Sequence, residues 1–307
     1  MSDFYGPADE DEGIATIRAA IDGGVTLIDT GDFYGMGHNE MLIAKALQGR
    51  RKDVFLQVKF GALRGPDRAW NGIDNRPVAV KNFVAYSLRR LQTDYIDLYQ
   101  PSRVDPNVPI EDTVGAIADL IKAGYVRHLG LSEASSATIR KAHAVHPVTS
   151  LQLEYSLVSR GIESDILPTV RELGIGVTVY GVLSRGLLSG SKPNGLTDFR
   201  AHLPRFAAEN LEKNLRAVRA LAEFAAAKHA TAAQAAIAWV LGRGDDIVPL
   251  IGARKRVRLA ESLAALEMRF GAADLAQLER LVSPDAIAGT RYQEAQMRIL
   301  DSERPGS

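Results

Sequence analysis

The amino-acid sequence predicts an α/β fold, a (β/α)₈ TIM barrel whose first strand is missing from this chain. Strand-like apolar runs alternate with amphipathic helical segments along the 307 residues, and most of the connections are short. Such alternation is typical of a wholly parallel sheet. Six of the strand-like runs end in, or run into, a polar or charged residue. Because barrels of this class hold their reactive groups at the carboxyl ends of the strands, we expect these residues to meet in space.

The pattern contains seven strands rather than eight. They are expected at residues 25–29, 54–59, 95–100, 125–131, 149–154, 175–180 and 246–251. Helices are expected at residues 9–23, 39–48, 77–91, 110–123, 135–145, 162–173, 208–229, 231–242 and 255–267. The chain enters its first helix at once, so the first and last strands should be unpaired edges of an open barrel. No linker interrupts the pattern, and we expect one domain over residues 1–307.

Composition narrows the possible functions. Lysine plus arginine and aspartate plus glutamate number 37 each, so the net charge gives no case for binding nucleic acid or an anionic membrane. Cysteine is absent, which excludes disulfides and thiolate zinc sites. No apolar run approaches the roughly 18 residues that span a bilayer, and the N-terminus lacks a signal-peptide pattern. We expect a cytoplasmic protein with a small-molecule substrate and no metal; the sequence carries no signal for an oligomeric state.

Asp29, Tyr34 and Lys59 form the candidate catalytic unit. A tyrosine hydroxyl has an ordinary pKa of about 10, and a neighbouring lysine ammonium should lower that value. Asp29 would hold Lys59 in place, and the tyrosine could then exchange a proton with a carbonyl oxygen. An ordinary buried ion pair beside a packed tyrosine is the alternative interpretation.

A second candidate unit follows the last strand. Gly252, Ala253 and Arg254 lead into a helix whose first backbone N–H groups, with Arg254 and Arg258, could hold a phosphate. The surplus of positive charge favours NADP over NAD, although a solvated basic helix face remains possible. Tyr180, at a strand end, could stack on a flat ring. No Gly-x-Gly-x-x-Gly loop follows the first strand, so a Rossmann site is not indicated.

These residues lie in segments that resemble the aldo-keto reductase family along essentially the whole chain. The similar segments, in order, are GVTLIDTGDFYGMGHNE, LQVKFG, YIDLYQPSRVDP, GLSEAS, LQLEYS, VYGVLSRGLLSG and PLIGARKRVRLAES. The resemblance implies a TIM barrel that binds NADP(H) without a Rossmann domain. The residues that it implies for the cofactor are Ser132, Gln152, Tyr180, Gly181, Leu183, Arg185, Gly186, Gly252, Ala253, Arg254, Arg258, Glu261 and Ser262. The segment RKAHAVHPVTSLQLEYSLVSR is similar to the branch of general aldehyde reductases that includes pyridoxal reductases.

The chain departs from the family pattern in three places. Ser102 occupies the position of the histidine that orients the substrate carbonyl in the family, which puts the rate of carbonyl turnover in doubt. Glu133 and Ser262 both stand where the family often has asparagine. The resemblance also implies a hairpin and a strand ahead of Met1, so we expect a truncated chain or a late start.

Three interpretations follow. The first is an NADP(H)-dependent reductase of small aldehydes or ketones, in which Tyr34 donates the proton. The second is a nicotinamide-binding regulatory module with weak or no turnover, which Ser102 in the histidine position favours. The third is a damaged gene product that folds poorly. The sequence does not identify the physiological substrate.

Overall fold

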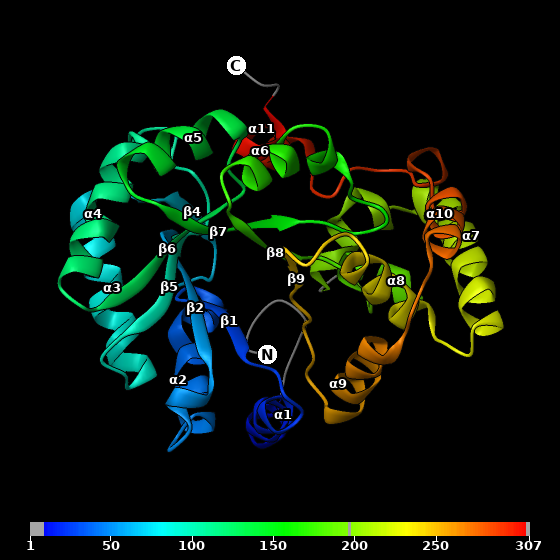
Figure 1. Cartoon of the computed structure of the whole chain (residues 1–307), viewed down its shortest axis with the longest axis horizontal. Coiled ribbons are helices and arrows are strands. Elements are labelled where there is room, and N and C mark those ends of the chain that lie inside the picture. Colours follow the sequence, from blue (N-terminus) through cyan, green and yellow to red (C-terminus); the bar gives the residue numbers. More distant parts are fainter. Residues whose placement is uncertain (1–8, 196–197, 305–307) are drawn as a thin grey trace.

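The computed structural model describes residues 9–195 and 198–304, and seven parallel strands form its centre (Figure 1). The strands follow the order β1-β2-β5-β6-β7-β8-β9 in the sheet. Every expected strand is present, within two residues of its expected bounds. The bounds are β1 Leu27–Gly31, β2 Phe55–Phe60, β5 Ile96–Pro101, β6 Val126–Ser132, β7 Val148–Glu154, β8 Gly176–Tyr180 and β9 Ile247–Pro249.

Helices cover the outer face of the curled sheet (Figure 1). Their ends follow local sequence signals: the Asp9 side chain accepts a hydrogen bond from the Glu12 backbone N–H at 2.8 Å, and Pro77 opens α3. The helices are α1 Glu10–Asp22, α2 His38–Ala46, α3 Pro77–Leu91, α4 Ile110–Lys122, α5 Ser136–Val145, α6 Ile166–Glu172, α7 Ala208–Ala227, α8 Ala232–Leu241, α9 Arg256–Leu263, α10 Ala272–Leu281 and α11 Glu294–Ile299. The sequence analysis anticipated the first nine and missed α10 and α11.

The two faces of each strand differ in polarity. On β2, Leu56, Val58 and Phe60 are completely buried in the apolar core that the strands share with the helices. Between them, Gln57 and Lys59 are buried on the inner face. Parallel strands with both faces covered are expected to be buried along nearly their whole length. On β2 the buried polar side chains lie on the face that points into the barrel.

Hydrogen bonds across the interior show how strongly the sheet curls. Gln57 on β2 donates its side-chain amide to Thr178 Oγ1 on β8 at 3.3 Å, although three strands lie between β2 and β8 in the sheet order. A flat sheet would hold these side chains more than ten ångströms apart, because neighbouring strands are separated by about 4.8 Å. The sheet is therefore curved into most of a barrel.

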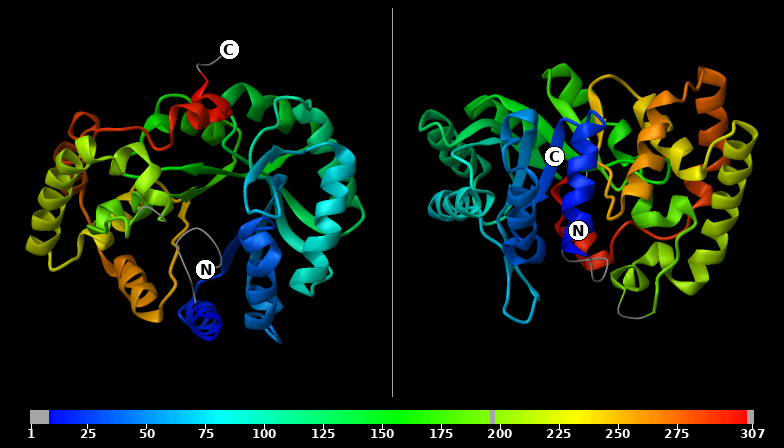
Figure 2. Two further views of the ribbon diagram at one scale, coloured as in Figure 1. Left: turned by 180° about the vertical axis from the view of Figure 1, so that it is seen from behind. Right: turned by 90° about the horizontal axis from the view of Figure 1, so that it is seen from below.

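The barrel is open between β1 and β9. Within the described residues, β1 pairs with β2 alone and β9 pairs with β8 alone. The expectation of seven strands, with β1 and β9 at the edges, is confirmed. Helix α1 lies between α2 and α9 at this open side (Figure 2), and Arg256 at the start of α9 forms an ion pair with Glu12 of α1 at 3.0 Å.

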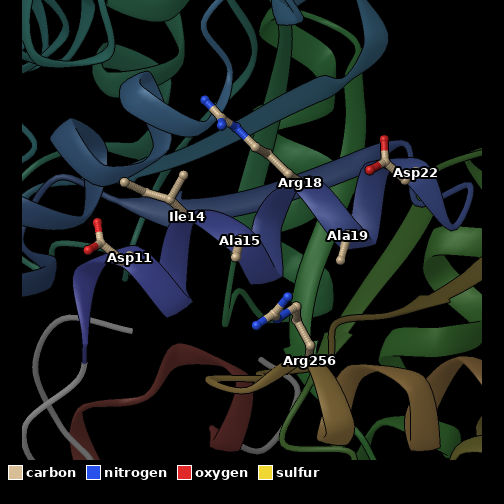
Figure 3. Close-up of a pocket in the computed structure, with 7 residues that line it drawn as sticks. All are labelled: Asp11, Ile14, Ala15, Arg18, Ala19, Asp22 and Arg256. Carbon is tan, nitrogen blue, oxygen red and sulfur yellow. The ribbon is translucent and has the colours of Figure 1, made fainter.

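A pocket lies between α1 and Arg256 (Figure 3). Asp11, Ile14, Ala15, Arg18, Ala19 and Asp22 of α1 form its other lining. It is separate from the strand ends that carry Asp29 and Lys59.

Among the described residues, no helix is both long and apolar enough to cross a membrane.

A short antiparallel hairpin covers one strand end and was not anticipated from the sequence. It pairs β3 (Ala62–Arg64) with β4 (Trp70–Ile73) through a tight turn that Gly65 and Arg68 close at 2.9 Å. The Trp70 ring lies 5.5 Å from that of Phe33, the residue before Tyr34. The hairpin therefore lies beside the segment that carries the candidate proton donor.

Candidate active site

Asp29 is the centre of a hydrogen-bonded group at the carboxyl ends of the strands. Its Oδ2 lies 2.5 Å from Lys59 Nζ on β2, and its Oδ1 accepts from the side-chain amides of Gln152 on β7 at 2.8 Å and Gln57 at 3.1 Å. Lys59 is only 4% exposed. Asp29 thus neutralises a buried ammonium and fixes its position, because a buried charge needs a close partner.

Tyr34 approaches this group from a 3₁₀ turn that follows β1. The turn covers Tyr34–Gly37, and Lys59 Nζ lies 5.2 Å from the centre of the Tyr34 ring. Gly35 and Gly37 adopt positive φ angles of 58° and 91°, which L-residues rarely adopt. The turn reverses the chain within four residues and places the tyrosine beside the lysine, as expected for the candidate catalytic unit.

The pKa of Tyr34 corrects one expectation. Burial raises it, Lys59 opposes the rise, and Asp29 adds to it, so the net pKa is above the ordinary value rather than below it. Burial also lowers the pKa of Lys59, but the charges and hydrogen bonds of Asp29 and Tyr34 together outweigh that effect and leave the pKa raised. Near neutral pH the site therefore holds a protonated tyrosine beside a charged lysine.

Ser102 follows β5, next to the end of β2. Its backbone N–H donates to the Phe60 carbonyl at 2.8 Å, which continues the pairing of the two strands. Its hydroxyl is buried and has no hydrogen-bond partner among the described residues. The next residue is Arg103, which the sequence analysis did not assign to the site.

Ser132 is the last residue of β6, and Glu133 follows it. The Ser132 hydroxyl is likewise buried and without a partner in the described part of the chain. Glu133 has a positive φ of 52° and accepts hydrogen bonds from Arg291, from Ser302, and from the Tyr180 hydroxyl at 2.7 Å. Burial would raise the pKa of Glu133, but Arg291, the Arg103 charge and the Ser302 hydrogen bond together outweigh burial and hold it far below its usual range.

Arg291 and Tyr292 are the residues that the sequence analysis missed. Tyr292 O–H lies 3.2 Å from the Tyr180 hydroxyl, and its ring faces the Arg185 guanidinium at 4.5 Å. Glu133 was recognised as a departure from the family pattern, and a buried carboxylate requires a cationic partner. The sequence could therefore have indicated that Glu133 has a cationic partner. Nothing in the sequence around Glu133 identifies which arginine that partner is.

The loop after β8 contributes Gly181, Leu183, Arg185 and Gly186. Arg185 forms an ion pair at 3.0 Å with Glu154, a carboxylate at the end of β7 whose side chain is fully buried. Gly181 and Gly186 have positive φ angles of 69° and 92°. The loop therefore lies beside Tyr180 with its arginine already paired inside the protein.

The basic segment after β9 lies at the open edge of the barrel, on different elements from Asp29 and Tyr34. Gly252, Arg254 and Arg258 are exposed, whereas Ala253 is buried. Arg258 pairs with Glu261 at 2.8 Å, and the Ser262 hydroxyl donates to the Arg258 carbonyl at 2.9 Å. The expected residues thus form two groups, one around Asp29 and Tyr180 and one at the start of α9.

Among residues 9–195 and 198–304, no cluster of histidine or acidic side chains is arranged to hold a metal ion.

Comparisons with known proteins identify the family of the chain. Over 297 residues the chain is 43% identical to "Probable aldo-keto reductase 1" from Glycine max, a match that covers 94% of this chain and 84% of the relative. A structure of a glycerol dehydrogenase from Gluconobacter oxydans superposes with a TM-score of 0.84 at 30% identity, covering 92% of this chain and 89% of that one. An aldo/keto reductase from Klebsiella pneumoniae, solved with NADP and acetate, gives a TM-score of 0.71 at 27% identity and covers 90% of this chain and 86% of that one. Residues 1–283 match the model of the aldo/keto reductase family, and the chain therefore belongs to that family.

Proposed function

We propose that the protein is an NADP(H)-dependent oxidoreductase that reduces small aldehydes or ketones to alcohols. The arrangement of Tyr34, Lys59 and Asp29 is the observation that carries the proposal. A protonated tyrosine beside a buried, charged lysine is suited to give a proton to an oxygen atom that becomes an alkoxide. Two of the structural relatives support the cofactor, because aldo-keto reductases from Klebsiella pneumoniae were solved with NADP and with NADPH.

Each residue of the group has a distinct task. Tyr34 O–H donates its proton to the carbonyl oxygen and leaves a phenolate. Lys59, charged and 4% exposed, stabilises that phenolate electrostatically. Asp29 holds Lys59 at 2.5 Å and is itself oriented by Gln152. The nicotinamide cofactor, when bound, supplies the hydride; in the oxidation direction Tyr34 takes the proton back.

The described residues fit a nicotinamide beside this group. The buried Ser132 hydroxyl lacks a partner among the described residues and is available to an amide. Tyr180, partly exposed and fixed through its hydroxyl by Glu133, presents a ring for stacking. We assign Ser132, Gln152 and Tyr180 to the nicotinamide, and the loop of Gly181, Leu183, Arg185 and Gly186 to the pyrophosphate.

The start of α9 is assigned to the adenosine end of the cofactor. Arg254 and Arg258 are exposed at the open edge of the barrel, and with Gly252, Ala253, Glu261 and Ser262 they would surround a 2′-phosphate. Arginine is suited to a phosphate because its donors form a planar fork. We therefore propose a preference for NADPH over NADH.

A second function is favoured by Ser102. The family histidine that orients the carbonyl is replaced by a hydroxyl that is buried and shorter. A protein that binds the nicotinamide but turns over slowly could act as a regulatory module. Tyr34 and Lys59 remain in place, however, so we rank reduction first.

One experiment separates the two functions. NADPH binding is measured by fluorescence, and NADPH oxidation is measured with a panel of small aldehydes and ketones. Binding with turnover supports the reductase, and binding with no turnover on any carbonyl supports the regulatory module. A protein that does neither contradicts both.

A further inference from the structure

Arg103 is a cation at the active site that is not ion-paired with a carboxylate in the part of the chain that the structure describes. It follows Ser102 and is partly exposed. Its Nη1 donates to the Ser102 carbonyl at 2.6 Å, and its Nη2 lies 3.4 Å from the Tyr292 hydroxyl. Among the described residues it forms no ion pair, and these two bonds use only two of the five N–H groups that a guanidinium carries.

The position of Arg103 relates it to the substrate rather than to the cofactor phosphates. Lys59 and Gln100 are partners in the register of β2 and β5, so Arg103 leaves the sheet beside the strand that carries Lys59. The basic segment around Arg254 instead follows β9, four strands away in the sheet order. Although burial dominates the pKa of Tyr34, the Arg103 charge opposes that rise together with Lys59, which places Arg103 within electrostatic reach of the proton donor.

The other described cations around this site each form an ion pair within the protein. Lys59 is paired with Asp29 at 2.5 Å, Arg185 with Glu154 at 3.0 Å, and Arg291 with Glu133 at 2.6 Å. Arg205 shares Glu154 with Arg185 and also donates to the Val158 carbonyl at 2.6 Å. Arg103 is therefore the one cation of this group without a direct ion pair among the described residues, although the Glu133 carboxylate, which Arg291 already holds, also attracts it.

We propose that Arg103 binds an anionic group of the substrate, and that the enzyme prefers aldehydes or ketones carrying a carboxylate. This inference rests on the proposed reductase function. The planar guanidinium matches the geometry of a carboxylate, and a partly buried pair of this kind is screened less than one on the open surface. Anchoring the far end of the substrate would also orient its carbonyl toward Tyr34. It would thereby supply part of the positioning that the histidine at the Ser102 position gives in the family.

A matched pair of substrates tests the proposal. Initial rates of NADPH oxidation are compared for 4-formylbenzoate and its methyl ester, which share the aldehyde and differ in the negative charge. The purified full chain is compared with Arg103→Gln, Arg103→Lys and Arg140→Gln. Arg140 is the control because it is an exposed arginine on α5 that pairs with Glu172, away from the strand ends.

The measured quantity is the ratio of kcat/KM for the acid to kcat/KM for the ester. We expect Arg103→Gln to lower this ratio by about 10- to 100-fold, the effect of one charged hydrogen-bonding partner, mostly through the KM of the acid. Arg103→Lys should restore part of the ratio, and Arg140→Gln should leave it unchanged. In the unmodified enzyme, added salt should raise the KM of the acid more than that of the ester. This last measurement needs no variant and remains available if Arg103→Gln fails to fold.

Other outcomes overturn the proposal. An unchanged ratio in Arg103→Gln, or equal losses for both substrates, would show that Arg103 polarises the carbonyl or holds Tyr292 instead. If the unmodified protein oxidises NADPH with neither aldehyde, the carbonyl panel described above decides the reductase function, and the anion site is tested by calorimetric binding of 4-formylbenzoate with NADP present. Equal dissociation constants for the unmodified protein and Arg103→Gln would exclude the site.

Discussion

Arg291 and Glu133 form a buried ion pair, with Nη2 and Oε2 2.6 Å apart, that joins the C-terminal segment to the end of β6. Both side chains are almost completely buried. A second bond connects Arg291 Nη1 with Glu133 Oε1 at 2.9 Å, and Tyr180 donates to the same oxygen at 2.7 Å. The position of the Tyr180 ring, and with it our proposed nicotinamide site, therefore depends on an arginine 158 residues away from Glu133 in the sequence.

Replacing Arg291 should destabilise the fold strongly. Arg291→Met leaves the Glu133 carboxylate buried without its partner, and such changes cost about 3–5 kcal/mol. Urea unfolding at neutral pH measures the loss. Arg298→Met is the control, because Arg298 lies on α11 in an exposed pair with Glu294 and should change stability by less than about 0.5 kcal/mol.

A second variant tests the cause of that loss. Glu133→Gln combined with Arg291→Met removes both charges, and it should be more stable than Arg291→Met alone. Equal stability of Arg291→Met and Arg298→Met would mean that the pair does not hold the C-terminal segment.

Replacing Tyr34 should remove turnover and leave cofactor binding in place. Tyr34→Phe keeps the ring but loses the proton, so we expect kcat to fall by about 10²–10⁴-fold while NADPH affinity stays within about twofold. Tyr86→Phe is the matched control, since Tyr86 is exposed on α3. Because burial raises the pKa of Tyr34, reduction by the unmodified enzyme should decline only above the ordinary tyrosine value of about 10. A Tyr34→Phe enzyme with normal turnover would exclude Tyr34 as the proton donor.

Most of the helices and strands could be predicted from the sequence, because each long element shows a periodic pattern of apolar residues within its own segment. The strand ends that carry Asp29, Lys59 and Gln152 could be located because β/α alternation places them on one side of the barrel. The β3–β4 hairpin was missed because its strands have three and four residues, too few to show a period of two. The contact of Arg291 with Glu133 was missed because it joins distant segments and depends on packing alone.

The predicted direction of the Tyr34 pKa shift was wrong for a related reason. Sequence reasoning supplied the charge of Lys59, which does lower the pKa. It could not supply the degree of burial, which has the larger effect and raises the pKa. Contact between two charges can be inferred from strand register, whereas desolvation depends on every side chain that covers the group.

The two exposed arginines at the start of α9 should select NADPH over NADH. Arg254→Ala and Arg258→Ala should each weaken NADPH binding by about tenfold or more, the scale of one charged hydrogen bond, with little change for NADH. Arg256→Ala is the control, because Arg256 is also exposed at the start of α9 and points to Glu12 of α1, with which it forms an ion pair. Fluorescence titration with both cofactors measures the effect. If NADPH and NADH weaken alike, these arginines contact a part of the cofactor that both share.

Asp32 should make the protein less stable as the pH rises. Burial, followed by repulsion from the neighbouring Glu40 carboxylate, raises the pKa of Asp32 from 3.8 to about 8. The Arg90 guanidinium lies 2.5 Å from the Glu40 carboxylate and forms an ion pair with it. Asp32 Oδ1, in contrast, has no hydrogen-bond partner within the described residues. Between pH 4 and about 8, the unfolded chain releases a proton that the folded chain retains, so the free energy of unfolding falls across this range.

Asp32→Asn removes this titration and should therefore change the pH dependence of stability. At pH 8 we expect the variant to be more stable than the unmodified protein by about 1–3 kcal/mol, whereas near pH 4 the difference should be small. Urea unfolding across this pH range measures both proteins, and Asp94→Asn, at an exposed aspartate, is the control. An Asp32→Asn protein with the same pH dependence as the unmodified one would show that Asp32 is already ionised at neutral pH, with the Arg90 charge shared between Asp32 and Glu40.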